Sequence, residues 1–229
     1  MTGPTPDAPR RGETRTRVVL RPYASPLPLG FFAFVIGMVL VAGVALGWLG
    51  RADLTTVGTI MALFVFPLEL MSTVFAILTR DTAAATTLGL YSTSWMTLGV
   101  LYALHPTQQT SHAVGMFLAA FAVVLIPLTV GAFFGKALLA VVLTVSVIRA
   151  VFQAVYELGA PHWTNTASGV SALLLVVLGC YAGIVFMVED FRGGSGLTLR
   201  RGPARQALTD EPHDQFAEAP HEPGVRRQL

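Results

Sequence analysis

Six long apolar stretches, joined by short polar connections, dominate the middle of the chain. Crossing the hydrocarbon core of a bilayer takes about 20 predominantly apolar residues in a helix. The apolar positions follow helical periodicity and show no series of short alternating strands. The pattern predicts an all-α polytopic membrane protein whose residues 25–192 form a compact bundle of six transmembrane helices. The predicted spans are Leu29–Leu49, Val57–Leu78, Ala83–Leu104, Ala113–Phe134, Ala137–Leu158 and Gly169–Met187.

Both ends of the chain are polar. Residues 1–24 are rich in Pro, Thr and Arg, and residues 193–229 are rich in Gly, Arg, Pro and acidic residues. Neither end has the apolar periodicity that a packed core needs, so both are predicted to be disordered tails. Thirteen of the fifteen Lys and Arg residues lie in the tails or in the even-numbered connections. The positive-inside rule therefore predicts that both termini are cytoplasmic.

The composition argues against catalysis and against nucleic-acid binding. The chain is 53% hydrophobic and 12% charged, with one cysteine, Cys180, and one lysine, Lys136. No zinc signature, phosphate-binding glycine loop or nucleophile-elbow motif is present. The basic residues of the tails are not interleaved with aromatic residues, as a nucleic-acid surface would favour. We expect no enzyme activity, no metal site, no cofactor and no nucleic-acid partner; the expected partner is the lipid bilayer.

Three charged residues lie within the predicted spans. Glu157 falls at a span end, where a charge is tolerated, but Glu69 and Arg149 fall near mid-span. A charge at the bilayer centre costs about 2.5–3.5 kcal/mol on insertion scales. At 1.5 Å per residue, Glu69 lies roughly 18 Å and Arg149 roughly 14 Å from the same end of the bundle. Three interpretations stay open: a structural ion pair, an anion-attracting Arg149 with Glu69 as proton acceptor or gate, or one of the two side chains pointing into a headgroup or a partner subunit.

The third span is unusually rich in hydroxyl groups. Thr86, Thr93 and Thr97 share one helix face by their seven- and four-residue spacing. Such a face either lines a pore or donates hydrogen bonds to the backbone of its own helix. Mid-span prolines, Pro67 and Pro127, leave a similar choice between a free carbonyl that faces a polar cavity and a plain packing kink.

Two short motifs carry a family resemblance. The first stands before the first span and consists of Ser25, Pro26, Leu27, Pro28, Leu29, Gly30 and Phe31. The second lies in the third span and consists of Asp81-Thr82, Tyr91-Ser92 and Trp95-Met96-Thr97-Leu98. Together they resemble the signature motifs of the acetate uptake transporter family, and the resemblance extends over roughly residues 25–200.

The resemblance implies a six-helix pore in the plasma membrane for acetate or similar small monocarboxylates. It also implies a homo-oligomer, a hexamer in that family. A narrow apolar and aromatic constriction controls passage, and by the motifs it would contain Phe34, Tyr91 and Leu143.

This chain departs from the family pattern at several positions. Ser25 replaces the leading Asn of the first motif, and bulky residues at positions 64–69 replace a glycine-rich segment. Glu69 stands where the family has glutamine, and Arg149 stands where an apolar residue is expected. These changes bear on the identity of the substrate.

The sequence thus predicts a transporter or channel for acetate or a similar small monocarboxylate, with proton coupling through Glu69 as one mechanism. The alternative is a non-transporting sensor, regulator or assembly protein that keeps the six-helix bundle, which the bulky second span would suit. A continuous polar path past Tyr91 would favour the transporter.

Overall fold

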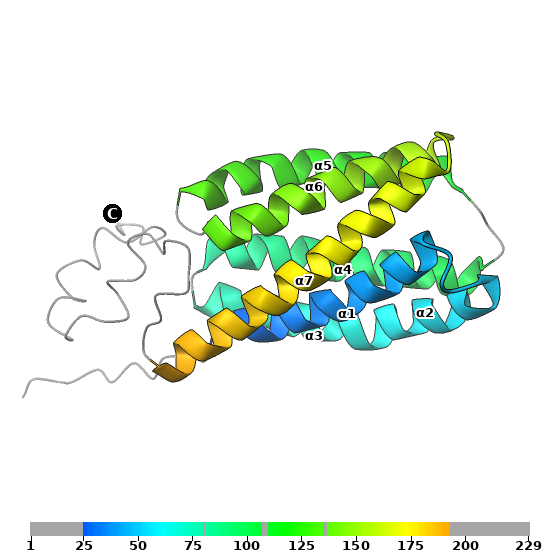
Figure 1. The fold of residues 1–229 in the computed structure, drawn as a ribbon. Coiled ribbons are helices and arrows are strands. Elements are labelled where there is room, and N and C mark those ends of the chain that lie inside the picture. The colour runs from blue at the N-terminus through cyan, green and yellow to red at the C-terminus, as the bar shows by residue number, and fades with distance from the viewer. Residues whose placement is uncertain (1–24, 80, 107–109, 135–136, 193–229) are drawn as a thin grey trace, which may run out of the picture.

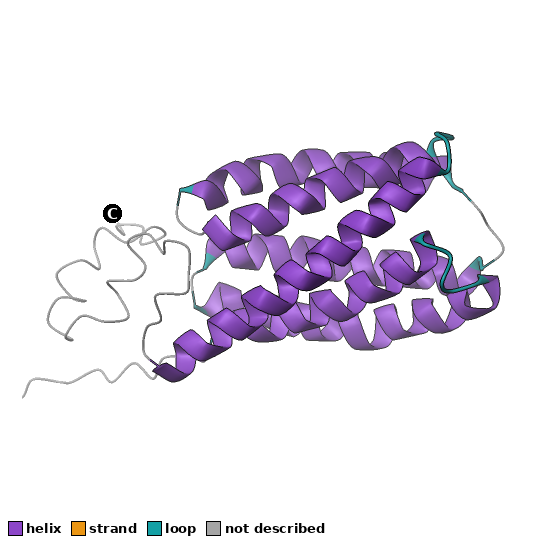
Figure 2. Cartoon of the chain, viewed as in Figure 1, coloured by secondary structure: helices purple, strands orange, loops and turns teal. Residues whose placement is uncertain are grey.

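The computed structural model describes residues 25–79, 81–106, 110–134 and 137–192, and every regular element in these ranges is a helix (Figures 1 and 2). The two predicted tails lie outside the described residues. The elements are α1 (Leu27–Ala45), η1 (Arg51–Asp53), α2 (Leu54–Ile60), η2 (Met61–Val65), α3 (Phe66–Leu78), α4 (Thr82–Leu104), α5 (His112–Phe133), α6 (Ala137–Glu157) and α7 (Trp163–Arg192).

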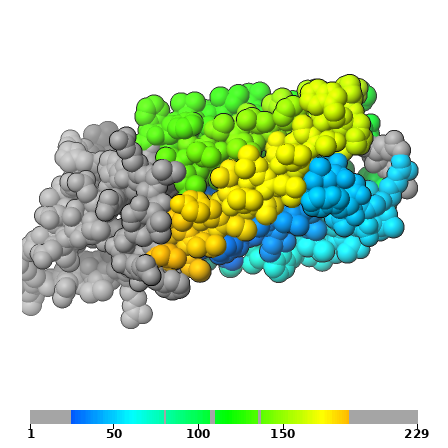
Figure 3. Space-filling model, viewed as in Figure 1, coloured from blue at the N-terminus to red at the C-terminus, as the bar shows by residue number. Residues whose placement is uncertain are grey.

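The helices pack as a ring of antiparallel neighbours. Helix α1 packs against α3 and α7, α3 against α4, α5 against α6, and α6 against α7. The ring closes between α4 and α5, which touch at only a few positions. Helix α7 crosses one face diagonally and covers both α1 and α6 (Figure 3). We call the end where α1 begins and α7 ends the terminal end, and the opposite end the distal end.

Five stretches are long and apolar enough to cross a membrane, as judged over the described residues: Leu27–Ala45, Arg51–Leu78, His112–Phe133, Ala137–Glu157 and Trp163–Val188. The remaining predicted span, the third, corresponds to α4, which has 23 residues and is long enough to cross. Its hydroxyl groups lower its hydropathy, and the ring places it between α3 and α5. The prediction of a helical membrane bundle is therefore confirmed, whereas the orientation of its termini remains a prediction.

The helix boundaries differ from the prediction mainly at the distal end. Helix α1 ends at Ala45 rather than Leu49, because Gly47 adopts a positive φ of 75° that favours glycine and turns the chain. Helix α7 begins at Trp163, six residues before the predicted start. At the terminal end, Pro26 precedes α1 and Pro28 lies in its first turn, where a missing N–H breaks no helical hydrogen bond.

The second span is continuous from Arg51 to Leu78 but widens at its centre. The π-helical segment η2 ends one residue before Phe66-Pro67. A proline ring clashes with the carbonyl four residues earlier, and a π-type turn is a common way to absorb that conflict. Beyond the widened turn the helix resumes, and its buried face continues through Glu69, Ser72 and Ala76.

Helices α2 and α4 approach each other through a pair of glycines. A Cβ atom on Gly58 would lie 2.3 Å from the carbonyl oxygen of Gly99 and 2.7 Å from the amide nitrogen of Ala103. A Cβ on Gly99 would lie 2.7 Å from the carbonyl oxygen of Gly58. Small residues let membrane helices pack closely enough for backbone contact. This crossing holds α4 against the second span.

Replacement of Gly58 by alanine should destabilise the bundle, because the new methyl group meets backbone atoms that move only with their helices. We expect a loss of about 1–3 kcal/mol in unfolding free energy, typical of overpacking. Gly131 in α5 is the matched control, since a Cβ there meets nothing within 4 Å. Gly131→Ala should leave stability unchanged or raise it. Thermal unfolding in detergent micelles measures both variants, and equal midpoints would contradict the close crossing.

Candidate functional site

An aromatic cluster fills the middle of the ring. The ring of Tyr91 in α4 packs edge-on against Phe34 of α1 at 5.1 Å between centroids. It packs edge-on against Phe121 of α5 at 5.2 Å on its other side. The indole of Trp95, one turn along α4, lies 6.3 Å from Phe34 and 6.4 Å from Tyr91. Edge-on pairs at such spacings are favourable aromatic contacts. We call these four residues the aromatic cluster.

The structure brings the three predicted constriction residues into one buried region. Phe34, Tyr91 and Leu143 are 5%, 5% and 1% exposed and belong to the same hydrophobic core. Ser146 lies one turn from Leu143 on α6, and its hydroxyl neighbours the Tyr91 phenol without reaching hydrogen-bond geometry. Sequence reasoning missed Phe121; its only signal was the spacing of Phe117 and Phe121 on one face of α5.

Glu69 is buried in the interior, and no described residue forms an ion pair with it. Its side chain is fully buried, and neither carboxyl oxygen has a hydrogen-bond partner among the described residues. The nearest polar group is the indole N–H of Trp95, which interacts with the carboxyl group although the pair does not meet hydrogen-bond geometry. A buried polar group without a hydrogen bond is destabilising. The Glu69 carboxyl group is therefore expected to lower the stability of the folded bundle.

Arg149 lines a cavity of about 90 Å³ at the distal end, and Glu69 does not line it. Its side chain is half-buried, its Nε atom is inaccessible to solvent, and it donates no hydrogen bond to a described residue. One water molecule needs about 10–15 Å³ of cavity volume measured in this way, so the cavity has room for several waters or for a solute of a few heavy atoms. We call it the distal cavity. Its lining is Val41, Val44, Ala45, Leu98, Leu101, Tyr102, His105, Thr110, Ser111, Val114, Leu118, Arg149, Gln153, Glu157 and Asn165.

A second charge lies at the rim of the distal cavity. One oxygen of Glu157 accepts a hydrogen bond from the Ser111 amide at 2.8 Å, and the other accepts one from Gln153 Nε2 at 3.2 Å. Ser111 is the residue before the first turn of α5, where a negative charge complements the helix dipole. The Tyr102 phenol lies within electrostatic range of both Glu157 and Arg149.

The structure excludes the ion-pair alternative for Glu69 and Arg149. Both oxygens of Glu69 lack a partner, and no salt bridge joins these two described residues. Their helices are not neighbours, because α3 packs on α1 and α4 whereas α6 packs on α5 and α7. Tyr91 lies within electrostatic range of both side chains. Similar depth alone therefore did not bring the two charges into contact.

The predicted hydroxyl residues lie on the exposed face of α4. Thr86, Thr93 and Thr97 each donate a hydrogen bond to a carbonyl one turn earlier in their own helix, at 2.8–3.0 Å. At about 100° per residue, this face lies opposite Tyr91 and Trp95. The backbone-bonding alternative is therefore the one observed.

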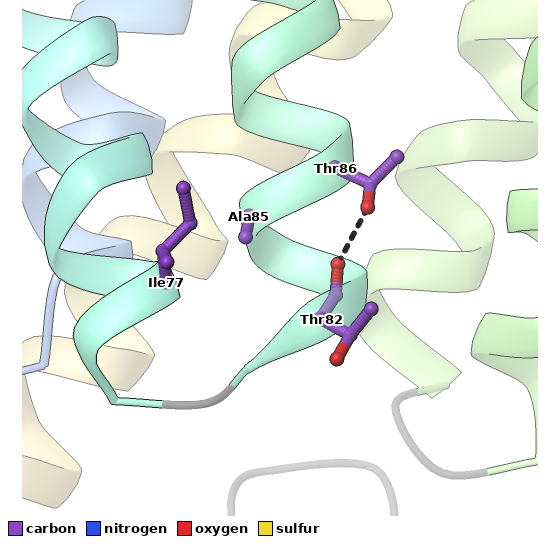
Figure 4. Close-up of a pocket in the computed structure, with 4 residues that line it drawn as sticks. All are labelled: Ile77, Thr82, Ala85 and Thr86. Carbon is purple, nitrogen blue, oxygen red and sulfur yellow. Dashed lines mark hydrogen bonds between the residues drawn. The ribbon is translucent and has the colours of Figure 1, made fainter. Parts of the chain in front are cut away.

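Thr86 also lines an open pocket of about 380 Å³ at the terminal end, together with Ile77, Thr82 and Ala85 (Figure 4). The Thr86 hydroxyl points to the carbonyl of Thr82 rather than across this pocket.

The first family motif has a packing role in the structure. A Cβ on Gly30 would lie 2.7 Å from a methyl group of Leu88, so this glycine lets α1 approach α4. Among the described residues, no group of three or more His, Cys, Asp or Glu side chains is placed to hold a metal ion.

The described chain forms a ring of largely apolar helices with an aromatic cluster in its interior. The chain shares its fold with the bacterial acetate channel SatP, with a TM-score of 0.69. The superposition covers 79% of this chain and 100% of SatP, at 17% sequence identity. No protein-family model and no curated protein matches the sequence. The likeness therefore establishes the fold, and SatP itself is a channel rather than an enzyme.

The different environments of the two glutamates make a testable contrast in stability. Glu69→Met replaces an unpartnered buried carboxyl group by an apolar side chain of similar size, so we expect unchanged or higher stability. Glu157→Met removes an acceptor from Ser111 and Gln153, and we expect a loss of about 1–3 kcal/mol. Unfolding midpoints in detergent micelles compare the two. An equal loss in both variants would mean that the Glu69 carboxyl group has a stabilising partner.

Proposed function

We propose that this protein is a membrane channel or transporter for acetate or a similar small monocarboxylate. The observation that carries the proposal is the fold shared with an acetate channel over the whole length of that channel. The interior of the bundle supports it independently, since a half-buried guanidinium without a hydrogen-bond partner is unusual in a merely structural core. A positive group of this kind can replace part of the hydration of an anion that passes through a membrane.

The proposed path follows three regions of the interior in order. A carboxylate enters the distal cavity and meets Arg149. It then has to pass the constriction of Phe34, Tyr91 and Leu143, whose rings and side chain are packed together. Glu69, which lies within electrostatic range of Tyr91, is the third region of the proposed path. Because the distal cavity does not reach past Tyr91, the present arrangement is a closed one, and conduction requires the edge-on contact of Phe34 and Tyr91 to open.

Proton coupling is proposed to run through Glu69. Its carboxyl group is buried without a positive partner, so a change in its charge would be strongly felt by Trp95 and Tyr91. In this mechanism a proton taken up at Glu69 accompanies the anion across the constriction.

We further propose a homo-oligomer in the plasma membrane with both termini cytoplasmic, as the resemblance and the charge distribution imply. Exposed apolar side chains on the second span and on α5, such as Leu63 and Met116, suit contact with lipid or with another copy.

One observation favours the alternative of a non-transporting sensor or regulator. Phe64, Phe66 and Pro67 make the second span bulky where the family has glycines, and the aromatic cluster closes the interior. In that interpretation the distal cavity binds a ligand that never crosses. Flux and binding must therefore be measured separately.

Acetate flux into vesicles tests the proposed function. At pH 8 acetate is almost fully ionised, because carboxyl groups ordinarily titrate near pH 4, and passive leakage is small. We expect faster uptake of radiolabelled acetate into proteoliposomes than into protein-free vesicles. Phe34→Ala should raise the rate several-fold, since it removes a ring contact worth about 0.5–1.5 kcal/mol from the closed constriction.

Phe133→Ala is the matched control for that experiment. Phe133 lies on the outer surface of α5 with 60% exposure, so its removal should leave acetate uptake unchanged. Uptake at the level of protein-free vesicles, for both the wild type and Phe34→Ala, would contradict transport and favour the sensor.

Proton coupling through Glu69 predicts a change in pH dependence. Glu69→Gln preserves the size and polarity of the side chain but cannot take up or release a proton. We expect the pH dependence of acetate uptake between pH 5 and 8 to flatten in this variant while the protein remains folded. Asp53→Asn, an exposed change at the distal end, should keep the wild-type profile. A profile identical to wild type in Glu69→Gln would remove Glu69 from the coupling mechanism.

A further inference from the structure

We propose that the distal cavity is a binding site for one small monocarboxylate, held by Arg149, and that Glu157 at its rim excludes dicarboxylates. This inference deepens the proposed function, on which it rests, by assigning the selectivity for charge to two residues of α6. Neither the fold nor the predicted constriction specifies which carboxylates enter.

The state of Arg149 is the first argument for the site. The guanidinium group carries five N–H donors in a fixed planar fork that suits the two oxygens of a carboxylate. In this structure none of these donors is used by a described residue, although the side chain is half-buried. Buried donors normally have partners, and a charged donor without one is the least favourable case. A bound carboxylate would satisfy the fork and neutralise the charge.

The lining of the cavity is the second argument. The space of about 90 Å³ suits a solute of a few heavy atoms. Besides the polar side chains of α6, it is walled by apolar groups from three helices that would contact the alkyl end of the ligand: Val41 and Val44 of α1, Leu98 and Leu101 of α4, and Val114 and Leu118 of α5. A short monocarboxylate presents one charged end and one apolar end, which matches this division.

The third argument concerns the spacing of charges along α6. Arg149, Gln153 and Glu157 follow one another at four-residue intervals and all line the cavity. At 1.5 Å per residue, Glu157 stands roughly 12 Å beyond Arg149 along the helix axis, with Gln153 between them. A ligand held at Arg149 with a second carboxylate would extend that group toward Glu157. Like charges in a partly desolvated site repel strongly, so the dianion is disfavoured.

Glu157 is held in place for this role. Both of its oxygens accept hydrogen bonds, from the Ser111 amide and from Gln153, which is the pattern of an ionised carboxylate with fixed geometry. These bonds keep its charge at the rim, and no salt bridge between Glu157 and Arg149 neutralises it among the described residues. The other ionisable side chains that line the cavity are Tyr102 of α4 and His105, which follows the end of α4.

Equilibrium binding to the full-length protein in detergent micelles tests the site. Isothermal titration at pH 7.5 with acetate and with succinate, both ionised, gives two dissociation constants for each variant. We expect wild type to bind acetate more tightly than succinate. Arg149→Gln should weaken acetate binding by about tenfold or more, as for a charge-assisted hydrogen bond. Glu157→Gln should retain acetate binding and shift the acetate-to-succinate preference by about tenfold toward succinate.

Three features of the design keep the outcome decisive. Arg51→Gln removes an exposed positive charge near the same end of the bundle and should leave both dissociation constants unchanged. Arg149→Lys keeps the charge but not the fork, so it should bind acetate with intermediate affinity. The side-chain amide introduced by Glu157→Gln still offers an oxygen to the Ser111 amide, which separates loss of charge from loss of the hydrogen bond. Each variant is first checked to be folded, by its elution in gel filtration and by its unfolding transition, each compared with the wild type.

The results also separate this inference from the proposed function. Unchanged acetate affinity in a folded Arg149→Gln variant would overturn the site, even if the wild type conducts acetate. An unchanged preference in Glu157→Gln would overturn the exclusion of dicarboxylates. Conversely, acetate binding that depends on Arg149 without acetate flux in vesicles would leave the site standing and reject the channel.

Discussion

The packing of Tyr91 between Phe34 and Phe121 determines how the interior of this protein is organised. Helices α4 and α5 touch at only a few positions, so the Tyr91–Phe121 contact at 5.2 Å is a main link that closes the helix ring there. The Phe34–Tyr91 contact at 5.1 Å ties the same point to α1. The aromatic cluster therefore joins α1, α4 and α5 in the interior of the ring.

The two mid-span charges have different surroundings and do not pair. Arg149 lines the distal cavity with Gln153 and Glu157, whereas Glu69 lies beside Trp95 and does not line that cavity. An ion pair across the interior would neutralise both charges and would fill the space that a carboxylate needs. Their separation leaves each group available to a ligand or a proton. The instability that this brings is tolerated because the rest of the bundle is closely packed, as at the Gly58–Gly99 crossing.

Particular residues show where sequence reasoning succeeded and where it stopped. Periodicity placed the helices to within a few residues, because burial in a bilayer leaves few alternatives to apolar helices. The family motifs placed Phe34, Tyr91 and Leu143, and the structure brings these three into one buried region. Thr93 and Thr97 were harder to interpret, since a helix face alone does not reveal whether it turns toward the interior. Phe121 carried no motif, and its importance depends on a contact between helices that are distant in sequence.

Local hydropathy and the constant rise of an α-helix were enough to predict a bundle of membrane-spanning helices, the residues that are anomalous in a membrane interior and their depth. Which of these residues meet was not predictable in this way. Depth along the bundle axis is one coordinate, whereas contact also depends on the order of the helices around the ring and on the rotation of each helix about its axis. In the folded bundle, Tyr91 comes within electrostatic range of both Glu69 and Arg149, and Arg149 shares a cavity with Glu157.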